Sequence, residues 1–245
     1  MIFAEEHIQK LLRRAALFQH LAGLVSEPDA ELKERVVNGF QRLDPIGEPQ
    51  ENGSQQENLF VRTRRAWEQA DPDKLRTDYA RLFLLRSPHP LNETAYGEGR
   101  RLAGRENELA DINGFYRAFG VEVSKENPDL PDHLTTELEF YSTLLMKVAY
   151  AESLGLFEEA EITLEANKAF LEDHLGRWVG ALCREVNERK APSPYPESLS
   201  LIESVVAAEC GFMGAKPSPL TEPLAQTPLD KEPLTCPLAG SGKKK

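Results

Sequence analysis

The sequence PDHLTTELEFY, residues 131–141, predicts the central helix of the protein. From its start onward, apolar side chains recur at intervals of three or four residues, at Leu134, Leu138, Tyr141, Leu145 and Val148. This spacing forms one continuous stripe on an α-helix, whereas on a strand the same residues would scatter over both faces. We therefore expect a helix that begins near Asp132 and turns this stripe toward the core.

Polar side chains gather at the start of the same helix. His133 and Glu137 lie one turn apart, away from the apolar stripe, and Asp132 precedes them. Pro131 suits a first turn, where its missing N–H costs nothing, and Asp129 or Asp132 can accept hydrogen bonds from the unpaired amides there. The sequence thus places a histidine and carboxylates at a helix N-terminus. Asp132 could serve as a helix cap or as a binding residue. His133 could be a buried histidine of the interior instead of a site residue.

Length and composition narrow the class of protein. The chain has 245 residues, of which 40% are hydrophobic, so one domain can bury a core without disulfides or metal. A net charge of −11 argues against nucleic acid or anionic lipid as partner and favours a neutral or basic one. Cys183, Cys210 and Cys236 form no C-x-x-C pair, which fits a reducing compartment and indicates no zinc or iron–sulfur site. The sequence contains no apolar run of about 18 residues, so we expect no stable membrane insertion.

Helical periodicity extends along most of the chain, and no segment alternates with period two. The other predicted helices cover about residues 4–25, 29–43, 59–70, 72–83, 109–119, 158–189 and 199–210. Asp71 is a good N-cap for the helix that begins at Pro72, and Gly120 suits the position after the helix that ends at Phe119. Gly176 and Gly180 are expected to bend the long helix. The predicted fold class is all-α, a bundle of about seven to nine helices.

Two segments break this pattern. Residues 44–58 are rich in Pro, Gly, Asn and Gln and predict a flexible loop, and residues 87–99 predict a second loop. From Gly214 onward the chain is rich in proline, and leucine follows Pro219, Pro223, Pro228, Pro233 and Pro237. Such a tail favours polyproline II and is either disordered or docks its leucines into a groove on the body or on a partner. We expect a helical domain at residues 1–213 and an irregular tail at 214–245.

Several motifs occur together in one order. They are Tyr79-Ala80-Arg81-Leu82-Phe83, Glu93-Thr94-Ala95-Tyr96, DHLTTELEF at 132–140, and FLEDHL at 170–175 followed by Trp178. In these motifs the chain resembles the TorD/DmsD family of redox-enzyme maturation chaperones, related to the NarJ type, from the first helix to about Phe212. The aspartate–histidine pair before Glu-Leu-x-Phe is the most specific of them. The chain departs from the family at Thr94, where serine is common, at Tyr141, where methionine is common, and in its Pro-Leu tail.

The resemblance implies an all-helical cytoplasmic chaperone without enzymatic turnover and without a cofactor of its own. Members bind the twin-arginine signal peptide, and often the apo form, of a molybdopterin-containing oxidoreductase of the dimethyl sulfoxide reductase class. They assist insertion of the molybdenum cofactor and prevent premature export. The catalytic subunit of such an oxidoreductase is therefore the expected partner. Binding of a nucleotide or of the molybdenum cofactor itself is a further option that no motif locates.

A twin-arginine signal offers two guanidiniums followed by an apolar stretch of about 7–15 residues. Its receptor needs carboxylates beside an apolar groove. The residues expected to line this groove are Tyr79, Phe83, Leu134 and Tyr96. The residues expected to face the arginines are Asp132, Glu137 and Glu93, with His133 orienting the carboxylates. Tyr79, Phe83 and Trp178 are also typical of a core, and His174 is expected to be structural or exposed.

Two other functions fit parts of the sequence. A metal-dependent hydrolase could use Asp132, His133 and Glu137, but the chain has no second histidine at ligand spacing, no H-E-x-x-H and no phosphate-binding G-x-x-x-x-G-K. A helical adaptor could instead dock partners through the Pro-Leu tail. Loss of a partner on deletion of the tail would distinguish this adaptor from a signal-peptide chaperone.

Overall fold

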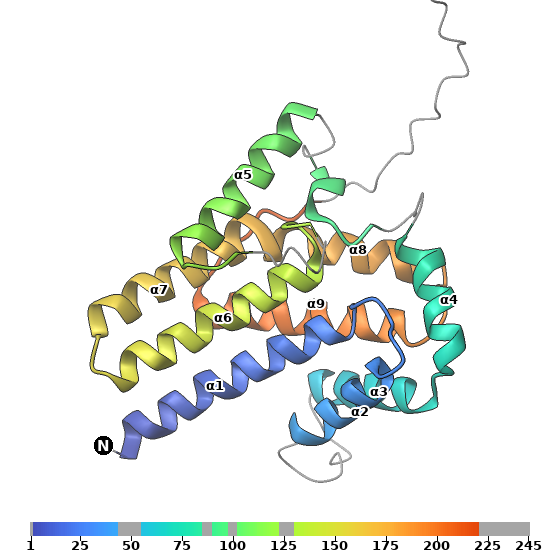
Figure 1. Cartoon of the computed structure of the whole chain (residues 1–245), viewed down its shortest axis with the longest axis horizontal. Helices are drawn as coiled ribbons and strands as arrows, with labels where there is room; N and C mark the ends of the chain where they lie inside the picture. The colour runs from blue at the N-terminus through green and yellow to red at the C-terminus, as the bar shows by residue number, and fades with distance from the viewer. Residues whose placement is uncertain (1, 44–54, 85–89, 98–101, 123–129, 221–245) are drawn as a thin grey trace, which may run out of the picture.

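The computed structural model describes residues 2–43, 55–84, 90–97, 102–122 and 130–220 (Figure 1). The helices in these residues are α1 Ile2–Gly23, α2 Leu32–Leu43, α3 Gln55–Gln69, α4 Pro72–Phe83, α5 Leu102–Ala118, α6 Leu134–Ser153, α7 Phe157–Phe170, α8 Gly176–Glu188 and α9 Tyr195–Met213. A 3₁₀ turn, η1 Glu93–Ala95, and a π-helical turn, η3 Leu171–Leu175, complete the regular structure of the described residues. The predicted all-α fold class is confirmed.

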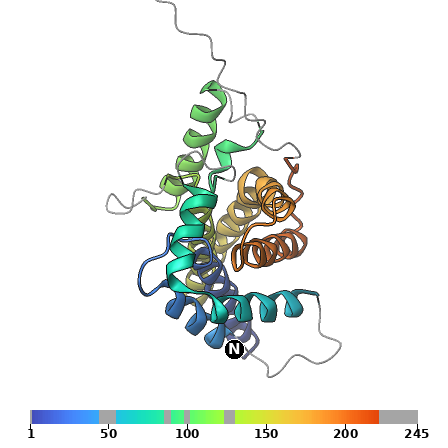
Figure 2. The ribbon, with the colours of Figure 1, turned by 90° about the vertical axis from the view of Figure 1, so that its right-hand side faces the viewer.

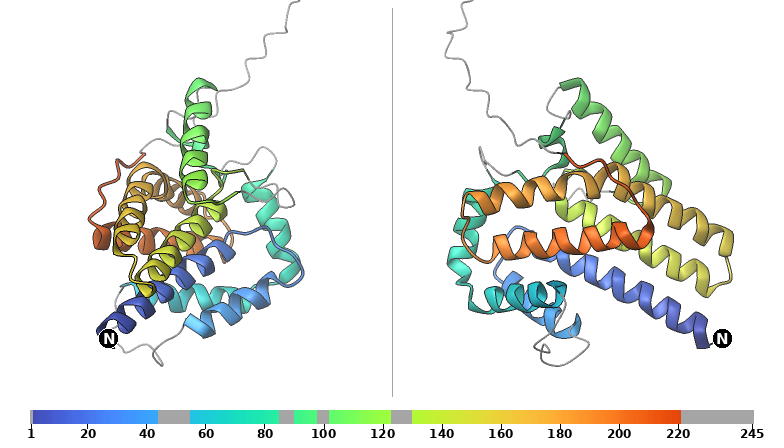
Figure 3. Two further views of the ribbon diagram at one scale, coloured as in Figure 1. Left: turned by 60° about the vertical axis from the view of Figure 1, so that its left-hand side comes forward. Right: turned by 180° about the vertical axis from the view of Figure 1, so that it is seen from behind.

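Helix α6 lies at the centre, between α1 and α7 (Figure 1). All members of the predicted stripe are fully buried, namely Leu134, Leu138, Tyr141, Leu145 and Val148. Full burial of a leucine stabilises the fold by roughly 1.5–3 kcal/mol, so this face anchors the core. Helices α8 and α9 lie side by side (Figure 3), and α3 packs against α9 at one end of the bundle (Figure 2).

The predicted helix boundaries hold where a local capping signal fixes them. Asp71 Oδ1 accepts hydrogen bonds from the amides of Asp73 and Lys74 at 3.0 and 3.5 Å, which makes it the N-cap of α4. Gly120 follows α5 with a φ of 66°, a left-handed conformation that suits glycine.

Several boundaries differ from the expectation, among them the first residues of α5 and α9, Leu102 and Tyr195, and those of α3 and α6. Helix α3 begins at Gln55, inside the segment predicted as a loop. Helix α6 begins at Leu134, and His133 rather than Asp132 is its N-cap, because His133 Nδ1 accepts the amide of Thr135 at 3.3 Å. Of the predicted loops and tail, residues 44–54, 87–89, 98–99 and 221–245, together with Asp129 and Cys236, lie outside the described residues.

The predicted long helix at 158–189 is interrupted. Helices α7 and α8 are joined through the π-helical turn η3, which ends immediately before Gly176 (Figure 3). A Cβ atom at Gly176 would clash with the carbonyl oxygen of Leu171, so glycine is required at this junction. A π turn inserts an extra residue into a helix and rotates the side chains that follow it. Here the turn carries His174 into the interior.

A short backbone contact fastens the loop around η1 to the start of α6. Asn92 and His133 form an isolated antiparallel bridge. The amide of Glu93 donates to the carbonyl of Asp132 at 2.9 Å, and the amide of Leu134 donates to the carbonyl of Leu91 at 2.8 Å. Two segments far apart in the sequence are thereby held in fixed register. Among the described helices, none is long and apolar enough to cross a membrane.

Candidate functional site

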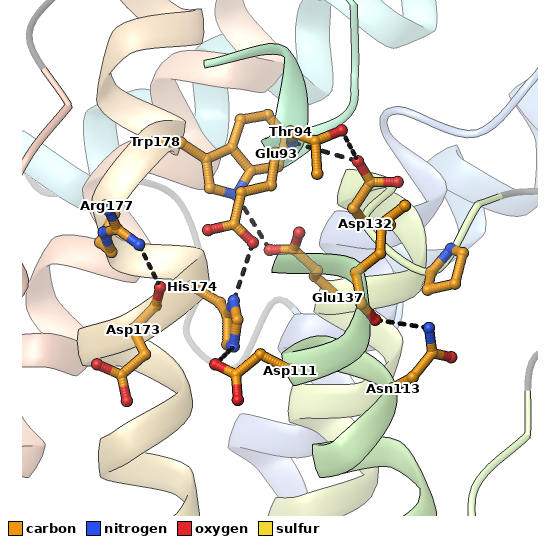
Figure 4. Close-up of polar contacts among 12 residues, drawn as sticks. Glu93, Thr94, Asp111, Asn113, Asp132, Glu137, Asp173, His174, Arg177 and Trp178 are labelled. Atoms are coloured by element: carbon orange, nitrogen blue, oxygen red, sulfur yellow. Dashed lines mark hydrogen bonds and ion pairs between the residues drawn. The ribbon is translucent and has the colours of Figure 1, made fainter. Parts of the chain in front are cut away.

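Three acidic side chains meet in the interior where this loop joins α6 (Figure 4). Glu93, from η1, is 1% exposed, and Asp132 and Glu137, from the start of α6, are 0% exposed. The structure thus brings together the three carboxylates that the sequence analysis expected to face arginines. Burial of ionised groups is costly unless each one is paired or hydrogen-bonded, so their partners determine what the cluster does.

Asp132 is fully engaged with the loop. Its Oδ2 accepts hydrogen bonds from the amide and the hydroxyl of Thr94, at 3.2 and 2.5 Å, and its Oδ1 accepts one from Asn92 Nδ2 at 3.1 Å. Hydrogen bonds to a carboxylate are stronger than those between neutral groups. Asp132 therefore positions the loop that carries Glu93, and it does not cap α6.

Glu137 has one hydrogen-bond donor and one unpartnered oxygen. Trp178 Nε1 donates to Glu137 Oε2 at 3.1 Å, whereas Glu137 Oε1 has no hydrogen-bond partner among the described residues. Burial raises the pKa of Glu137 well above its ordinary value, and the charges of Glu93, Asp132 and Glu108 raise it further, against the opposing effect of the Trp178 bond. Burial and the neighbouring carboxylates therefore favour the protonated form of Glu137.

Glu93 is connected to the surface through a histidine. His174 Nδ1 lies 3.0 Å from Glu93 Oε2, and His174 Nε2 lies 3.4 Å from Asp111 Oδ2 (Figure 4). The His174 side chain is 2% exposed, whereas that of Asp111, on α5, is 65% exposed. Glu93 Oε1 has no hydrogen-bond partner in the described part of the chain. Acidic groups therefore extend from the surface at Asp111 to the interior at Glu93.

Helix α5 contributes one further carboxyl group. Glu108 is half-buried, and burial followed by the charge of Glu93 raises its pKa to about 7, although Arg177 and His174 act in the opposite direction. Its Oε2 is buried without a hydrogen-bond partner among the described residues. No lysine or arginine of the described segments forms an ion pair with Glu93, Glu108, Asp132 or Glu137. We call these four residues with His174 the carboxylate cluster.

Aromatic rings pack around the buried members of the carboxylate cluster. The ring of Tyr96 lies 5.4 Å from that of Trp178, and the Tyr96 hydroxyl donates to the carbonyl of Pro90 at 3.2 Å. Phe115 and Phe170 lie 5.4 and 5.2 Å from the His174 ring. A low dielectric strengthens any charge interaction made inside such an enclosure.

The residues expected to line an open groove are core residues instead. Tyr79 and Phe83 pack against each other and against Tyr195, with ring centroids 5.2–6.1 Å apart. Tyr96 and Leu134 are completely buried. The four side chains are apolar and share a core, as their spacing on helices allows, but they do not form a surface groove. The expectation of an apolar groove at these positions is corrected.

The histidine beside the carboxylates is also different from the one expected. His133 is half-buried and caps α6, whereas His174, expected to be structural or exposed, contacts Glu93. Glu108 and Asp111 were not identified from the sequence. Their spacing of three residues places both on one face of α5. This spacing does not identify them as site residues unless that face is already known to cover Glu93.

Asp132, His133 and Glu137 were also considered as metal ligands. Among the described residues, no group of three or more His, Cys, Asp or Glu side chains is arranged to hold a metal ion. The oxygen atoms of Asp132 instead accept hydrogen bonds from Asn92 and Thr94.

The sequence profile of the family described as nitrate reductase delta subunit matches residues 49–184, more than half of the chain. A perchlorate reductase assembly chaperone protein of Dechloromonas aromatica is 33% identical over 135 residues, which cover 54% of this chain and 59% of that protein. A selenate reductase assembly chaperone protein of Thauera selenatis is 27% identical over 150 residues, which cover 61% of this chain and 76% of that protein. The chaperone protein TorD of Photobacterium profundum is 24% identical over 143 residues, which cover 57% of this chain and 64% of that protein.

The matched region thus spans less than two thirds of the length of the first of these relatives. All three are named as chaperones and not as catalysts, in agreement with the expectation that the chain is not an enzyme. The profile match covers η1, α5, α6 and η3, which together build the carboxylate cluster. The chain therefore belongs to the nitrate reductase delta subunit family, which confirms its resemblance to proteins of the TorD and NarJ type.

Proposed function

We propose that the protein is a cytoplasmic maturation chaperone for a molybdopterin-containing oxidoreductase. It binds the twin-arginine signal peptide and the apo form of this client, assists insertion of the molybdenum cofactor and prevents export before insertion is complete. The names of the relatives support the class of client, because each relative is a chaperone and two are named for assembly of a reductase. The carboxylate cluster supports recognition of the arginines.

One observation carries the proposal for the arginines, namely the two unpartnered oxygens Glu93 Oε1 and Glu137 Oε1. Leaving a buried acceptor without a donor costs about 1–3 kcal/mol. A guanidinium carries five N–H donors in a planar fork and a permanent positive charge. It can supply the missing hydrogen bonds and neutralise the cluster at once. An apolar residue can do neither, and a single neutral donor can satisfy one oxygen but leaves the charge of the cluster in place.

Access for a guanidinium is expected from the side of α5. Asp111 is the exposed member of the acidic series, Glu108 is half-buried, and Glu93 is buried. The negative charge of Asp111 attracts a cation at the surface, and the cluster binds it more strongly inside because the interior is dry. Entry requires α5 to move away from His174, so we expect recognition to involve a conformational change.

A separate surface suits the body of the client. Met146 and Tyr150 on α6 and Leu154, its C-cap, follow one another at intervals of four residues and are exposed, as is Phe157 at the start of α7. Exposed apolar patches of this kind mark interaction sites. An unfolded or cofactor-free client exposes apolar surface that can pack here. The double change Tyr150→Ser and Phe157→Ser is expected to weaken binding of the apoenzyme while leaving the affinity for an isolated signal peptide unchanged.

The test is capture of the tagged protein from an extract of its source organism, with bound proteins identified by mass spectrometry. We expect a molybdopterin oxidoreductase that still carries its uncleaved leader. The double variant Glu93→Gln/Glu137→Gln should lose this client, and Glu158→Gln, the same change at an exposed position of α7, should retain it. Recovery of mature, folded proteins alone would overturn the proposal. The adaptor interpretation would gain support if these proteins were lost on deletion of the Pro-Leu tail.

A further inference from the structure

The first part of the Pro-Leu tail is seated on the helical body. After Gly214 ends α9, residues 215–220 run back across the junction of α7 and α8 toward η1 (Figure 3). The amide of Lys216 donates to Glu172 Oε1 at 2.8 Å, and the amide of Leu220 donates to the carbonyl of Arg177 at 2.8 Å. Arg184 Nη2 donates to the carbonyl of Leu220 at 3.1 Å. The body therefore binds both backbone groups of Leu220.

Two glycines make room for the side chains of this segment. A Cβ atom at Gly97 would lie 2.9 Å from a methyl carbon of Leu220, and a Cβ atom at Gly176 would lie 2.9 Å from Cγ of Pro217. Contacts this short essentially never occur at a real Cβ, so a larger residue at either glycine would require the tail side chain to shift. Leu220 also packs against the hydrophobic core. We call these two contact points, Gly176 against Pro217 and Gly97 against Leu220, the notches.

These notches adjoin the carboxylate cluster. Gly97 follows Tyr96 and Arg177 precedes Trp178, and the rings of Tyr96 and Trp178 pack against each other. Trp178 in turn donates to Glu137. Arg177 acts on both sides, because its carbonyl binds the tail and its charge lowers the pKa of Glu108. The docked segment therefore bridges two elements that build the cluster.

The docked Pro-Leu pair differs in sequence from the later pairs of the tail. Five pairs occur, but only Leu220 has a second proline three residues earlier, at Pro217. Thr221, Gln226, Lys231 and Thr235 occupy the equivalent position of the later pairs. The segment Lys216–Leu220 also places a cation before apolar residues. A twin-arginine signal presents charge and apolar side chains in the same order.

We propose that residues 216–220 are a tethered peptide ligand of the surface formed by Gly97, Gly176, Arg177 and Arg184, and that a client signal peptide displaces them. The displacement rests on the proposed function, whereas the docking does not. A flexible tether keeps a ligand at an effective concentration of about 1 mM, which excludes weak competitors and admits a strong one. The tail then protects the surface next to the carboxylate cluster until a client arrives.

The docking is tested with a labelled peptide, Lys-Pro-Ser-Pro-Leu, titrated against full-length chains. Leu220→Asp should open the surface and bind this peptide about tenfold more tightly than the wild type. This factor assumes a peptide Kd of about 0.1 mM and an effective concentration of the tethered tail of about 1 mM. Leu229→Asp, the same change in a later pair, should behave as the wild type. Equal affinity of the wild type and Leu220→Asp, or no binding to Leu220→Asp, would overturn the docking.

A second measurement keeps the test valid if Leu220→Asp perturbs folding. Hydrogen exchange on the wild type should show protected amides at Lys216 and Leu220, and Arg184→Ala should reduce the protection at Leu220. Arg189→Ala, at the end of the same helix, should leave it unchanged. Exchange of both amides at the rate of an unstructured peptide would overturn the docking.

Displacement is tested by the affinity for the client signal peptide. It should be higher for Leu220→Asp than for the wild type and for Leu229→Asp. Equal affinity in all three chains would overturn displacement but leave both the docking and the chaperone function in place. Absence of signal-peptide binding to any of them would overturn displacement together with the proposed function, while the docking result would stand.

Discussion

Trp178 donates its indole N–H to Glu137, with 3.1 Å between Nε1 and Oε2, and both side chains are completely buried. This contact joins α8 to the first turn of α6 and supplies Glu137 with its one hydrogen-bond donor among the described residues. The pKa of Glu137 is nevertheless raised well above its ordinary value by burial and by Glu93, Asp132 and Glu108. The free energy of unfolding must therefore depend on pH through this residue.

We predict that stability falls as pH rises above about 4.5, the pKa of an unperturbed glutamate, and keeps falling up to the raised pKa of Glu137. In this range the folded chain retains a proton that the unfolded chain releases, so raising the pH favours unfolding. Glu108, with a pKa of about 7, adds a smaller effect of the same sign. Glu137→Gln should remove most of this dependence and raise the free energy of unfolding at pH 8, because the unfavourable ionisation of a buried carboxyl group is no longer possible.

Urea unfolding of the wild type and Glu137→Gln from pH 5 to pH 8 measures this effect. Glu158→Gln makes the same side-chain replacement at an exposed position and serves as the control. Parallel pH profiles for the wild type and Glu137→Gln would show that Glu137 titrates normally.

The hydroxyl of Thr94 is predicted to matter more than its methyl group. Thr94 Oγ1 donates to Asp132 Oδ2 at 2.5 Å in a buried site. Thr94→Val preserves the shape but removes the donor, and should lower the free energy of unfolding by about 1–3 kcal/mol. Thr94→Ser keeps the donor and should cost less than about 1 kcal/mol. Denaturant unfolding at pH 7 separates the two, and equal losses would mean that packing, not the hydrogen bond, holds the loop.

Two glycines of α8 are predicted to respond in opposite directions to alanine. At Gly176 a Cβ would clash with the carbonyl oxygen of Leu171 and approach Cys210 Sγ to 3.1 Å, so Gly176→Ala should cost about 1–3 kcal/mol. At Gly180 the nearest atom is the carboxylate oxygen of Glu203 at 3.1 Å, on a side chain that can move. Gly180→Ala should therefore be neutral or stabilise by up to about 1 kcal/mol. A thermal melt of each variant measures the difference, and a loss of stability on Gly180→Ala equal to that on Gly176→Ala would contradict this account of the π turn.

The sequence predicted features that depend on residues at fixed local spacing. The stripe on α6 followed from apolar periodicity, and the cap of α4 followed from Asp71 before Pro72. These signals do not require knowledge of neighbouring elements. For the same reason the choice between a capping role and a binding role for Asp132 stayed open, because aspartate before a helix suits both. The contact of Asp132 with Thr94, which lies 38 residues away, shows that Asp132 does not cap the helix.

Other features depend on contacts between distant segments. The pair of Glu93 and His174 is separated by 81 residues, and His174 reaches the interior through a π turn that periodicity alone does not reveal. Tyr79 and Phe83 were expected in a groove because their chemistry suits one, but it suits a core as well. The docking of Leu220 likewise depends on Gly97, to which no local pattern connects it. The sequence therefore brought the carboxylates into one hypothesis but did not predict which side chains surround them.

The most direct test is calorimetric titration of the signal peptide from a captured oxidoreductase against the wild type, Glu93→Gln/Glu137→Gln and Glu158→Gln. We expect the wild type and Glu158→Gln to bind with similar affinity, and the double variant to bind at least tenfold more weakly. A peptide with both arginines replaced by glutamine should bind the wild type at least about tenfold more weakly than the twin-arginine peptide does. The double variant should bind the two peptides with similar affinity. Equal affinity of the folded double variant and the wild type for the twin-arginine peptide would contradict the assignment of the carboxylate cluster as the arginine site.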